Sequence, residues 1–394
     1  MGVSVVGTYH SKFGRLDKDL YELLTEAGKE ALGDSGVPAK EIGHIFVGNF
    51  SGGGFNNREH LAPYALNIDT DLRFTPATRF ENACASGFAA IEGAKNAIEA
   101  GKIDYALVIG VEKMTALDTK GVTDVLAMAS YYPTEAAQGM TFPGLFAEFA
   151  KGYKEKYGIS DEELREILAK IAAKNYKNAL DNPCAQMAKD WDVEDVLALP
   201  DEKNPVVAPP LRLHDCSLVS DGAVALVLAN NEKAKELKDE VVELTDLIHT
   251  TDYLEQEKRT KSEFVAGKKA IEALYQQAEI TVDDLDFVEV HDCFTIAELL
   301  SYEAIGLAED GQGAKLLKDG TVYPGGKLPV NASGGLKAKG HPVGATGVSM
   351  AVVATRQLLG EPLGQKVDDA KLGLTFNLGG SAATNYAALF KKIK

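Results

Sequence analysis

The sequence contains few cysteines, and no two of them are close together. Its 394 residues include only Cys84, Cys184, Cys216 and Cys293, with no C-x-x-C pair. In a chain of this length such spacing does not indicate a disulfide framework, and it is typical of proteins in a reducing compartment.

The sequence also lacks the segments that direct a chain into or across a membrane. No apolar run approaches the roughly 20 residues that span a bilayer, and residues 1–20 have no basic start followed by a long apolar core. The final residues, LFKKIK, are not a peroxisomal Ser-Lys-Leu signal. These absences predict a cytoplasmic protein without a membrane partner.

An excess of basic residues is missing as well. The formal net charge is −17, so the average electrostatic field repels phosphate and argues against a nucleic-acid partner. The net charge does not exclude a local basic patch that binds a small anionic ligand. What the chain does have is 45% hydrophobic and 25% charged residues, the composition of a globular protein long enough for two or more domains.

The sequence repeats itself internally. Alternating helix-like and strand-like patterns predict an α/β protein. Four segments of the first half have counterparts, in the same order, in the second half: 31–48 with 273–291, 85–101 with 345–360, 105–112 with 372–380, and 221–229 with 379–390. One match of this kind would mean little, but four in the same order predict a gene duplication.

One segment interrupts this repeat. We divide the chain into a first half, residues 1–235, with an insert at about 115–212, and a second half, residues 236–394. The insert contains a predicted helix that Ser160 and Glu163 would open as a capping box. Long insertions on a rigid scaffold often carry binding surfaces, so we expect part of a ligand site there.

Cys84 is a candidate nucleophile. It lies in RFENACASGFAAIEGAKNAI (79–98), at a predicted strand-to-helix junction. The positive end of the helix dipole would lower the thiol pKa below about 8.5 and favour the thiolate. Small neighbouring residues would let a bulky acyl group approach. The alternative is a buried structural cysteine, which is the commoner role of a free cysteine.

His341 is a candidate general base. Its segment, NASGGLKAKGHPVGATGVSM (331–350), is rich in glycine, which permits close approach of the backbone to a ligand. The spacing fits neither a P-loop nor a dinucleotide fingerprint. A hydrogen-bonded structural histidine would also fit the pattern. However, this loop is the repeat counterpart of the Cys84 loop, and pairing of the halves about a pseudo-twofold axis would bring the two helix starts together.

The tripeptide His-Asp-Cys occurs at 214–216 and at 291–293. The second copy follows the predicted buried strand FVEV, at the end where ligands collect in open α/β sheets. Residues two apart on a strand share a face, so His291 and Cys293 would point the same way. The first copy precedes a closing strand, and we interpret Cys216 as structural. Cysteine and histidine also bind zinc, but their spacing has no paired-ligand signature, so no metal site is predicted.

These motifs together resemble those of the thiolase family, over residues 2–390. NACASG (82–87) is similar to the nucleophile motif of thiolases, and SGGLKAKGHPVGATG (333–347) to their Gly-His-Pro loop. HDCF (291–294) and NLGGSAATN (377–385) resemble the subgroup of archaeal and sterol-carrier-protein-type thiolases. Better-known thiolases carry an acid/base cysteine where this chain has Asn377, and in the subgroup His-Asp-Cys-Phe supplies it.

The resemblance implies a fold and a set of ligands. The implied thiolase fold has duplicated α/β halves, each a five-stranded sheet covered by helices, stacked as a five-layer α-β-α-β-α sandwich with an inserted loop domain. A homodimer or homotetramer is implied, with acetyl-CoA and CoA bound by the loop domain and by small residues around Ser333 and Gly334. On the predicted insert helix, Lys170, Lys174 and Lys177 share a face, which would either meet the CoA phosphates or be solvated.

The implied activity is that of an acetoacetyl-CoA thiolase, the reversible Claisen condensation of two acetyl-CoA molecules. Cys84 would be the nucleophile, His341 its general base and Cys293 the acid/base for the second substrate. The backbone N–H groups of Cys84 and Gly380 would form one oxyanion hole, and His341 with His291 a second. His291 stands where many thiolases carry asparagine. No cofactor is implied, because the CoA thioester is the substrate.

Other functions of the same fold stay open to different degrees. A decarboxylating ketosynthase needs no strong carbon base, and hydroxymethylglutaryl-CoA synthase uses a glutamate, so a catalytic Cys293 argues against both. A non-catalytic CoA-binding or scaffold protein would not need all four of Cys84, His291, Cys293 and His341. A degradative 3-ketoacyl-CoA thiolase of broader chain length remains, since no sequence feature defines an acyl pocket.

The resemblance to archaeal thiolases also implies a metabolic role and a partner. Those relatives supply acetoacetyl-CoA to hydroxymethylglutaryl-CoA synthase in the mevalonate route to isoprenoids. They are expected to associate with that enzyme through a small zinc-bearing OB-fold scaffold protein. Because the condensation is thermodynamically uphill, coupling to a downstream enzyme is an expected feature.

Overall fold

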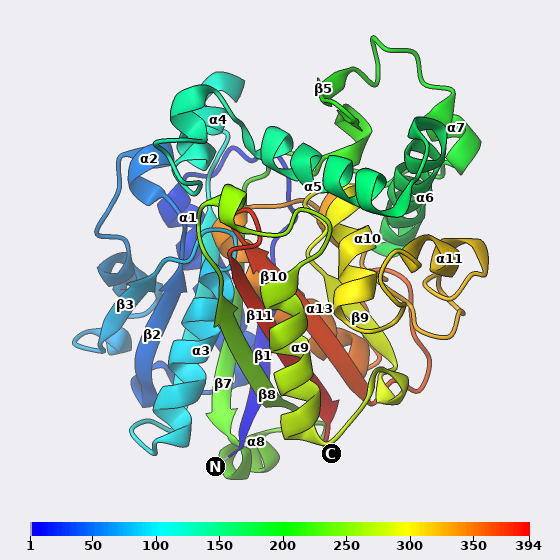
Figure 1. The fold of residues 1–394 in the computed structure, drawn as a ribbon. Coiled ribbons are helices and arrows are strands. Elements are labelled where there is room, and N and C mark those ends of the chain that lie inside the picture. The colour runs from blue at the N-terminus through cyan, green and yellow to red at the C-terminus, as the bar shows by residue number, and fades with distance from the viewer. Residues whose placement is uncertain (1) are drawn as a thin grey trace.

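Two β-sheets joined at one edge run through the middle of the molecule (Figure 1). The computed structural model describes residues 2–394. The strands follow one another across the joined sheets in the order β3-β2-β4-β7-β1-β8-β11-β10-β9. The strands of the first half are β1 (Val3–His10), β2 (Ile42–Gly48), β3 (Ala77–Phe80), β4 (Tyr105–Glu112) and β7 (Gly222–Asn230), and those of the second half are β8 (Val242–Thr251), β9 (Phe287–Val290), β10 (Leu372–Gly379) and β11 (Thr384–Lys392).

The two sheets have the same internal arrangement, as the sequence repeat predicts. Antiparallel pairing of β1 with β8 joins them, with Ser4 opposite Glu243. Outward from this junction, β7, β4 and β2 in the first half correspond to β11, β10 and β9 in the second. The counterpart of β3 is a single parallel bridge between Val288 and Val330. The fifth strand that we expected in the second sheet is therefore reduced to that bridge.

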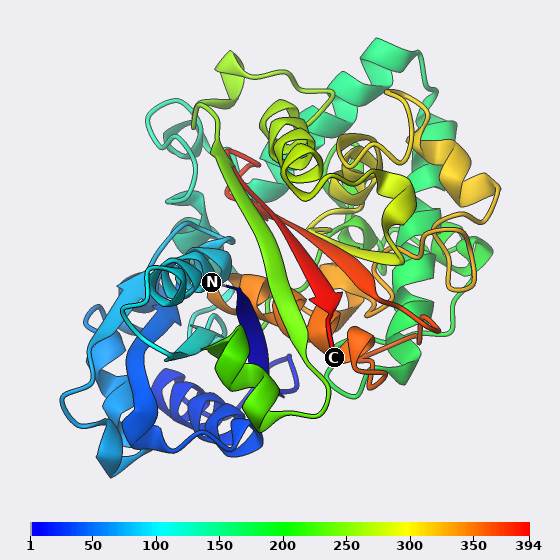
Figure 2. The same ribbon diagram turned by 90° about the horizontal axis from the view of Figure 1, so that it is seen from below.

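Helices cover both outer faces of the sheets and fill the space between them (Figure 2). Helix α1 (Leu20–Ser35) packs on the first sheet, and α9 (Val265–Ala278) packs on the second. Between the sheets lie α3 (Ser86–Glu99) and α13 (Thr346–Leu358), whose apolar side chains share one core with both sheets. This is the α-β-α-β-α layering of the thiolase fold, as the resemblance implied.

The two central helices begin side by side because of two glycines. A Cβ atom on Gly347 would lie 2.4 Å from the backbone nitrogen of Phe88. One on Gly87 would lie 2.7 Å from the backbone nitrogen of Val348. Any side chain at either position would push the helices apart. The loops that precede α3 and α13, which carry Cys84 and His341, are therefore neighbours, as the repeat predicts.

The insert between β4 and β7 forms the upper part of Figure 1. Its longest helix opens at Ser160, whose hydroxyl accepts a hydrogen bond of 3.1 Å from the Glu163 N–H, one of the two bonds of the predicted capping box. The elements of the insert are α4 (Thr119–Ala127), α5 (Phe142–Tyr157), α6 (Asp161–Asn178), α7 (Val193–Leu197), β5 (Val206–Ala208) and β6 (Leu211–Arg212).

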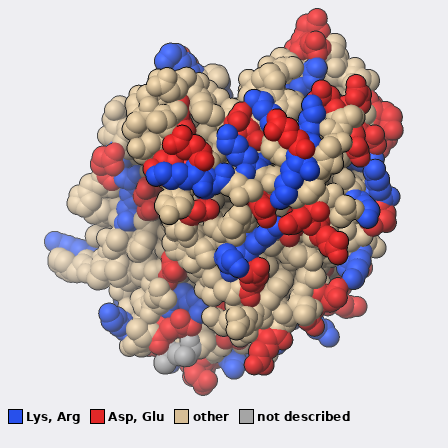
Figure 3. Space-filling view, in the orientation of Figure 1, with Lys and Arg blue, Asp and Glu red and all other residues tan. Residues whose placement is uncertain are grey.

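Short helices complete the fold at the ends of the sheets. They are α2 (Gly52–Asn56), α8 (Asn231–Leu237), α10 (Thr295–Ala304), α11 (Gly313–Lys318) and α12 (Gly335–Lys339). Within residues 2–394, no helix is both long enough and apolar enough to cross a membrane. On the face of the molecule seen in Figure 3, acidic and basic side chains are interspersed rather than gathered by sign.

Candidate active site

Cys84 lies in a tight turn between β3 and α3, as the sequence predicts. The preceding residue, Ala83, has φ of +50°, a left-handed conformation that L-residues adopt only when their surroundings hold them there. The Ser86 side chain provides that hold, since its hydroxyl accepts from the Asn82 N–H at 2.9 Å and donates to the Ala83 carbonyl at 2.6 Å. The turn aims the Cys84 thiol at the second half of the molecule.

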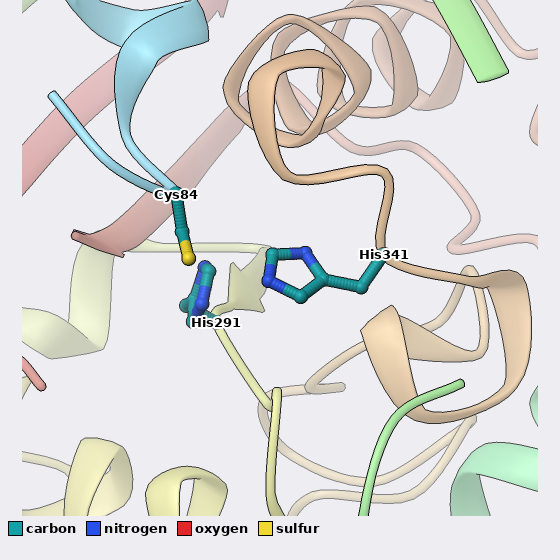
Figure 4. Close-up of side chains that lie close together, drawn as sticks. All are labelled: Cys84, His291 and His341. Carbon is teal, nitrogen blue, oxygen red and sulfur yellow. The ribbon is translucent and has the colours of Figure 1, made fainter. Parts of the chain in front are cut away.

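His341 approaches Cys84 from the loop between α12 and α13 (Figure 4). Its Nδ1 lies 2.7 Å from the Thr346 hydroxyl, and that hydroxyl donates its only proton to the Pro342 carbonyl at 3.0 Å. The arrangement that satisfies both contacts has the Thr346 oxygen accept from His341, which assigns the imidazole proton to Nδ1. The other nitrogen, Nε2, keeps its lone pair and is free to accept the Cys84 proton.

The second His-Asp-Cys tripeptide divides its side chains between two faces. The side chains of His291 and Cys293 lie near Cys84, whereas Asp292 accepts hydrogen bonds from the backbone N–H groups of Leu336 at 2.6 Å and Lys337 at 3.1 Å. Asp292 thus caps α12, the short helix that leads to His341. The alternation expected of a strand puts the chemical side chains on one face and the structural carboxylate on the other.

The structure brings the predicted catalytic side chains together. The Cys84 Sγ and one ring nitrogen each of His291 and His341 all lie within 4.8 Å of one another. The two imidazole rings are perpendicular, with centroids 5.0 Å apart (Figure 4). Cys84, His341, Cys293 and Gly380 line one cavity of about 160 Å³. His291 is fully buried beside them.

The walls of this cavity are mainly apolar. Helix α4 contributes Val122 and Leu126, and the start of α5 contributes Phe142 and Pro143. The insert therefore lines the cavity that contains Cys84, and its contact with a ligand remains a prediction.

Burial changes the acidity of the Cys84–His341 pair. It raises the pKa of the Cys84 thiol to about 12, a rise that the nearby carboxylates of Glu112 and Glu81 reinforce. Burial, together with the Lys339 ammonium, lowers the pKa of His341 to about 3. The prediction of a thiolate-favouring cysteine is therefore wrong for the resting site, because loss of hydration outweighs the hydrogen bonds from backbone N–H groups. The resting pair is a neutral thiol beside a neutral imidazole.

The other two side chains are also neutral at rest. Burial raises the pKa of Cys293 well above its ordinary value, and the neighbouring Cys84 adds to this. Burial, followed by repulsion from His341, lowers the pKa of His291 well below its ordinary value. The four side chains are therefore all uncharged in the resting site.

Backbone donors surround the Cys84 sulfur. Hydrogen bonding from the backbone N–H groups of Gly380 and of Cys84 itself opposes the rise in its pKa. Gly380 follows β10 directly and has φ of +60°, which places it in a tight turn. Two N–H groups that converge beside the nucleophile are the arrangement expected of an oxyanion hole. The family resemblance implied this role for Gly380, and the role remains a prediction.

Two predicted substrate-binding residues lie away from this cavity. Ser333 is buried, and its hydroxyl donates to Glu289 at 2.5 Å. Gly334 lies against Ala179, which a Cβ atom would approach to 2.5 Å. Neither lines the wall beside Cys84, and their contact with CoA remains a prediction.

The three lysines of α6 are largely occupied. Lys174 is fully buried and donates to the Val330 carbonyl at 2.6 Å, so it is not available to a phosphate. Lys170 pairs with Glu166, and Lys177 with Asp192. The alternative, a solvated face, is wrong for Lys174, which is buried. Contact of Lys170 and Lys177 with the CoA phosphates remains a prediction.

The first His-Asp-Cys tripeptide is partly structural. His214 Nδ1 lies 2.6 Å from the Tyr176 hydroxyl, and Asp215 forms two hydrogen bonds, of 3.0 and 2.9 Å, with Arg165. Cys216, however, lines the same cavity as Cys84, and the interpretation of Cys216 as purely structural is therefore incomplete. An antiparallel bridge between Cys216 and Phe294 brings the two tripeptides together in space.

Sequence reasoning missed Asn377 as a functional residue. It noted only that asparagine replaces the cysteine of better-known thiolases. In the structure the Asn377 side chain lies 2.7 Å from Nδ1 of His291, at the end of β10. It likewise missed Thr346, five residues after His341. The signal for both was polarity in segments that are otherwise apolar or glycine-rich.

The cluster of Cys84, His291 and His341 has residue types that also bind metals. A metal ligand needs a free lone pair on the nitrogen that faces the ion. Asn377 donates to Nδ1 of His291, so coordination of an ion through Nε2 would require loss of the only proton of the ring. The arrangement therefore suits hydrogen-bond donation and proton transfer.

Comparisons with known proteins agree with these motifs. The family model "Thiolase, N-terminal domain" matches residues 3–232, and "Thiolase C-terminal domain-like" matches residues 248–392. The acetyl-CoA acetyltransferase of Methanothermobacter thermautotrophicus is 38% identical over 99% of each chain. That of Methanocaldococcus jannaschii is 36% identical over 97% of each chain. Human sterol carrier protein 2 is 32% identical over 96% of this chain and 70% of its own.

Solved structures agree with the fold. The structure of an Ltp2-ChsH2(DUF35) aldolase matches with a TM-score of 0.81 at 20% identity, over 100% of this chain and 98% of its own. Human mitochondrial 3-ketoacyl-CoA thiolase in complex with CoA matches with a TM-score of 0.75 at 18% identity, over the same shares of the two chains.

Proposed function

The chain belongs to the thiolase family, and from this premise we propose that it is an acetoacetyl-CoA thiolase. The proposed reaction is the reversible condensation of two acetyl-CoA molecules into acetoacetyl-CoA and CoA. The observation that carries the proposal is the convergence of Cys84, His341 and Cys293 on one apolar cavity. Two relatives that match nearly their whole length are named acetyl-CoA acetyltransferase, which supports the choice of substrate.

In the first half-reaction an acetyl group moves to Cys84. Nε2 of His341 takes the thiol proton as the sulfur attacks the thioester carbonyl, which avoids a free thiolate in a site that disfavours charge. The developing oxyanion accepts from the backbone N–H groups of Cys84 and Gly380. When the intermediate collapses, CoA leaves as a thiolate, and the Cys293 thiol protonates it.

The second half-reaction uses the groups that the first one charged. The Cys293 thiolate removes a proton from the methyl group of the second acetyl-CoA, and the resulting enolate attacks acetyl-Cys84. His341 and His291 donate to the enolate oxygen. Collapse of the new intermediate releases acetoacetyl-CoA and a Cys84 thiolate, which recovers its proton from His341. Every proton is thus returned, and thiolysis is the same sequence in reverse.

The cavity size supports a short acyl chain. Its volume of about 160 Å³ resembles that of an engineered apolar cavity that binds benzene, so it holds only a few carbon atoms beside the thioester. Val122 and Leu126 of α4 and Phe142 of α5 would meet the end of a longer chain. We therefore favour acetyl and acetoacetyl groups over the long chains of a degradative enzyme.

A second cavity, next to the first, suits the nucleotide end of CoA. It has a volume of about 400 Å³ and shares Leu218 with the catalytic cavity. Lys189, Lys203 and Lys337 line it, and the ring of Trp191 offers a stacking surface. This group of cations supports an anionic substrate despite the negative charge of the whole chain.

The test is mass spectrometry of the intact protein after brief incubation with acetyl-CoA. Wild type and Cys293→Ala should each gain one acetyl group, Cys84→Ala none, and only wild type should form acetoacetyl-CoA. Cys184→Ala is the matched control, because Cys184 does not line the catalytic cavity, and it should behave as wild type. Full condensation by Cys293→Ala would place the carbon base elsewhere. No acetylation of wild type would leave the chain a thiolase in fold alone.

We further propose that the enzyme supplies acetoacetyl-CoA to hydroxymethylglutaryl-CoA synthase at the start of the mevalonate route in the cytoplasm. A dimer or tetramer of the chain would associate with that enzyme through a zinc-bearing OB-fold scaffold protein. Removal of the product would draw the unfavourable condensation forward. Size-exclusion chromatography of the three co-expressed proteins should give a shared peak, and separate elution would contradict the association. We expect no cofactor, so activity should survive dialysis against a chelator.

A further inference from the structure

Asn377 makes a specific contact with His291 inside the protein. It is fully buried near the end of β10, which runs parallel to β9. The backbone N–H of His291 donates to the Phe376 carbonyl at 2.9 Å, which sets the two side chains next to each other. The Asn377 Nδ2 then lies 2.7 Å from Nδ1 of His291 and 3.3 Å from the carbonyl of Leu378.

This contact determines which nitrogen of His291 carries the proton. An amide NH2 group only donates, so Nδ1 of His291 must present its lone pair. The amide orientation is itself determined by Leu378, because a carbonyl only accepts and would repel the Asn377 oxygen. Burial lowers the pKa of His291, so the ring is neutral. Its single proton is therefore on Nε2.

The Nε2–H group is a buried donor without a partner in residues 2–394. The Asn377 oxygen is likewise an unpaired buried acceptor. An unpaired buried polar group destabilises a fold, so proteins seldom keep two of them on side chains in contact. A donor that lies beside Cys84 and His341 and has no protein acceptor suits an oxygen of the substrate.

We propose that Asn377 is a positioning residue that holds His291 as the Nε2–H tautomer, so that His291 donates a hydrogen bond to the substrate oxygen during condensation. The inference rests on the proposed function, and it concerns the position where better-known thiolases carry their acid/base cysteine. Because Cys293 supplies the carbon base in this chain, residue 377 need not be a cysteine, and its side chain can orient His291 in the second oxyanion hole.

Asn377→Asp tests the inference through the pH dependence of condensation. At low pH the pair of the introduced carboxyl group and His291 holds two protons, one shared between the carboxyl group and Nδ1 and one on Nε2. At high pH the pair holds a single proton. The carboxylate then accepts a hydrogen bond from Nδ1–H, so Nε2 has no proton and cannot donate. Activity should then fall by about 100-fold across this transition, the usual effect of losing an oxyanion-hole donor. Wild type should show no such step.

The groups around His291 are the same in both proteins. His341 and Cys84 face it from the other two loops, and Asp292 and Cys293 flank it on its own segment. A step found only in Asn377→Asp therefore reports on residue 377. The matched control is Asn385→Asp, another fully buried asparagine on the neighbouring strand β11, which should change stability without adding the step.

A second readout needs no substrate. Nitrogen NMR of histidine-labelled protein, assigned with His291→Asn, should show Nε2 of His291 protonated in wild type and Nδ1 protonated in Asn377→Asp at high pH. If Asn377→Asp does not fold, Asn377→Leu should lose kcat about tenfold with KM retained and show a mixture of tautomers.

The outcomes separate the two proposals. A wild-type His291 with its proton on Nδ1, or a parallel pH profile for Asn377→Asp, overturns the role of Asn377 even if the enzyme condenses acetyl-CoA. A correct tautomer in a protein that never acetylates Cys84 overturns both the function and the catalytic part of the inference. The tautomer with the expected pH step supports both.

Discussion

At the scale of single residues, the ionisable side chains of the candidate active site are neutral at rest. Cys84, His341, His291 and Cys293 are all buried, and burial moves each pKa towards the neutral form. Neutral side chains suit a reaction that passes through an oxyanion and an enolate. Their hydrogen-bond donors can then stabilise the negative charge that develops on the substrate oxygen. Thr346 and Asn377 determine the tautomers of His341 and His291. These neutral rings donate and accept protons at the site without carrying a permanent charge.

The acidity of Cys84 can be measured through its alkylation. With a thiol pKa of about 12, the thiolate fraction should increase about tenfold per pH unit between pH 6 and 10. The rate of reaction with iodoacetamide should increase in the same way, without a plateau, after subtraction of the rate for Cys84→Ala. A plateau from about pH 5 upwards would instead indicate a thiolate–imidazolium pair in the resting enzyme.

At the scale of elements, the site depends on how closely α3 and α13 approach each other. Both helices start within the catalytic loops, so their separation sets the distance between Cys84 and His341. Gly87 and Gly347 are the residues at the contact, and each has no room for a Cβ atom. The glycines of the two repeated segments therefore set the separation of the candidate catalytic loops as well as the packing of the helices.

Gly87→Ala should damage both stability and activity. The added Cβ would lie 2.7 Å from the Val348 nitrogen, and such overpacking costs about 1–3 kcal/mol. We expect a lower Tm together with a fall in kcat of tenfold or more, measured by thermal unfolding and acetoacetyl-CoA thiolysis. Gly33→Ala in α1 is the control, since no atom lies within 4 Å of its Cβ position and alanine favours a helix by about 0.5–1 kcal/mol. An unchanged kcat in a folded Gly87→Ala protein would show that the helix contact does not set the catalytic distance.

At the scale of the whole molecule, the two halves share too much to fold apart. The central core contains Phe88 of α3 from the first half and Met350 of α13 from the second. The insert is tied to the second half as well, because Asn175 of α6 donates to Asp292 at 2.7 Å and to Glu298 at 2.6 Å. Separation of the halves would expose this core and leave buried polar groups unpaired.

Unfolding in urea should therefore be a single cooperative transition. The only tryptophan, Trp191, lies in the insert against Tyr176, so its fluorescence reports on that region. Its transition should coincide with that of far-UV circular dichroism, which follows the whole chain. An earlier transition by fluorescence would show that the insert unfolds alone. Residues 1–235 expressed by themselves should fail to give a folded protein.

The sequence determined a large part of the fold and of the composition of the candidate site. Internal repeats, together with motifs at helix starts, predicted the duplicated fold and the proximity of the candidate nucleophile Cys84 to His341. These features can be predicted because a strand-to-helix turn or a glycine-rich loop depends on residues that are adjacent in the sequence. The preference for 291–293 over 214–216 as the chemical tripeptide rested on its position after a buried strand and on the family resemblance, and it remains a prediction.

Only the tertiary structure decided the electrostatics and the partners of these residues. The pKa of Cys84 rises rather than falls, because solvent exclusion depends on what packs around the thiol and not on its place in the chain. Cys216 reaches the catalytic cavity through a bridge to Phe294, a residue far away in sequence. Asn377 meets His291 only because β10 pairs with β9 in one register. Hydration, cavity walls and tautomers arise from contacts between distant segments, and no local pattern records them.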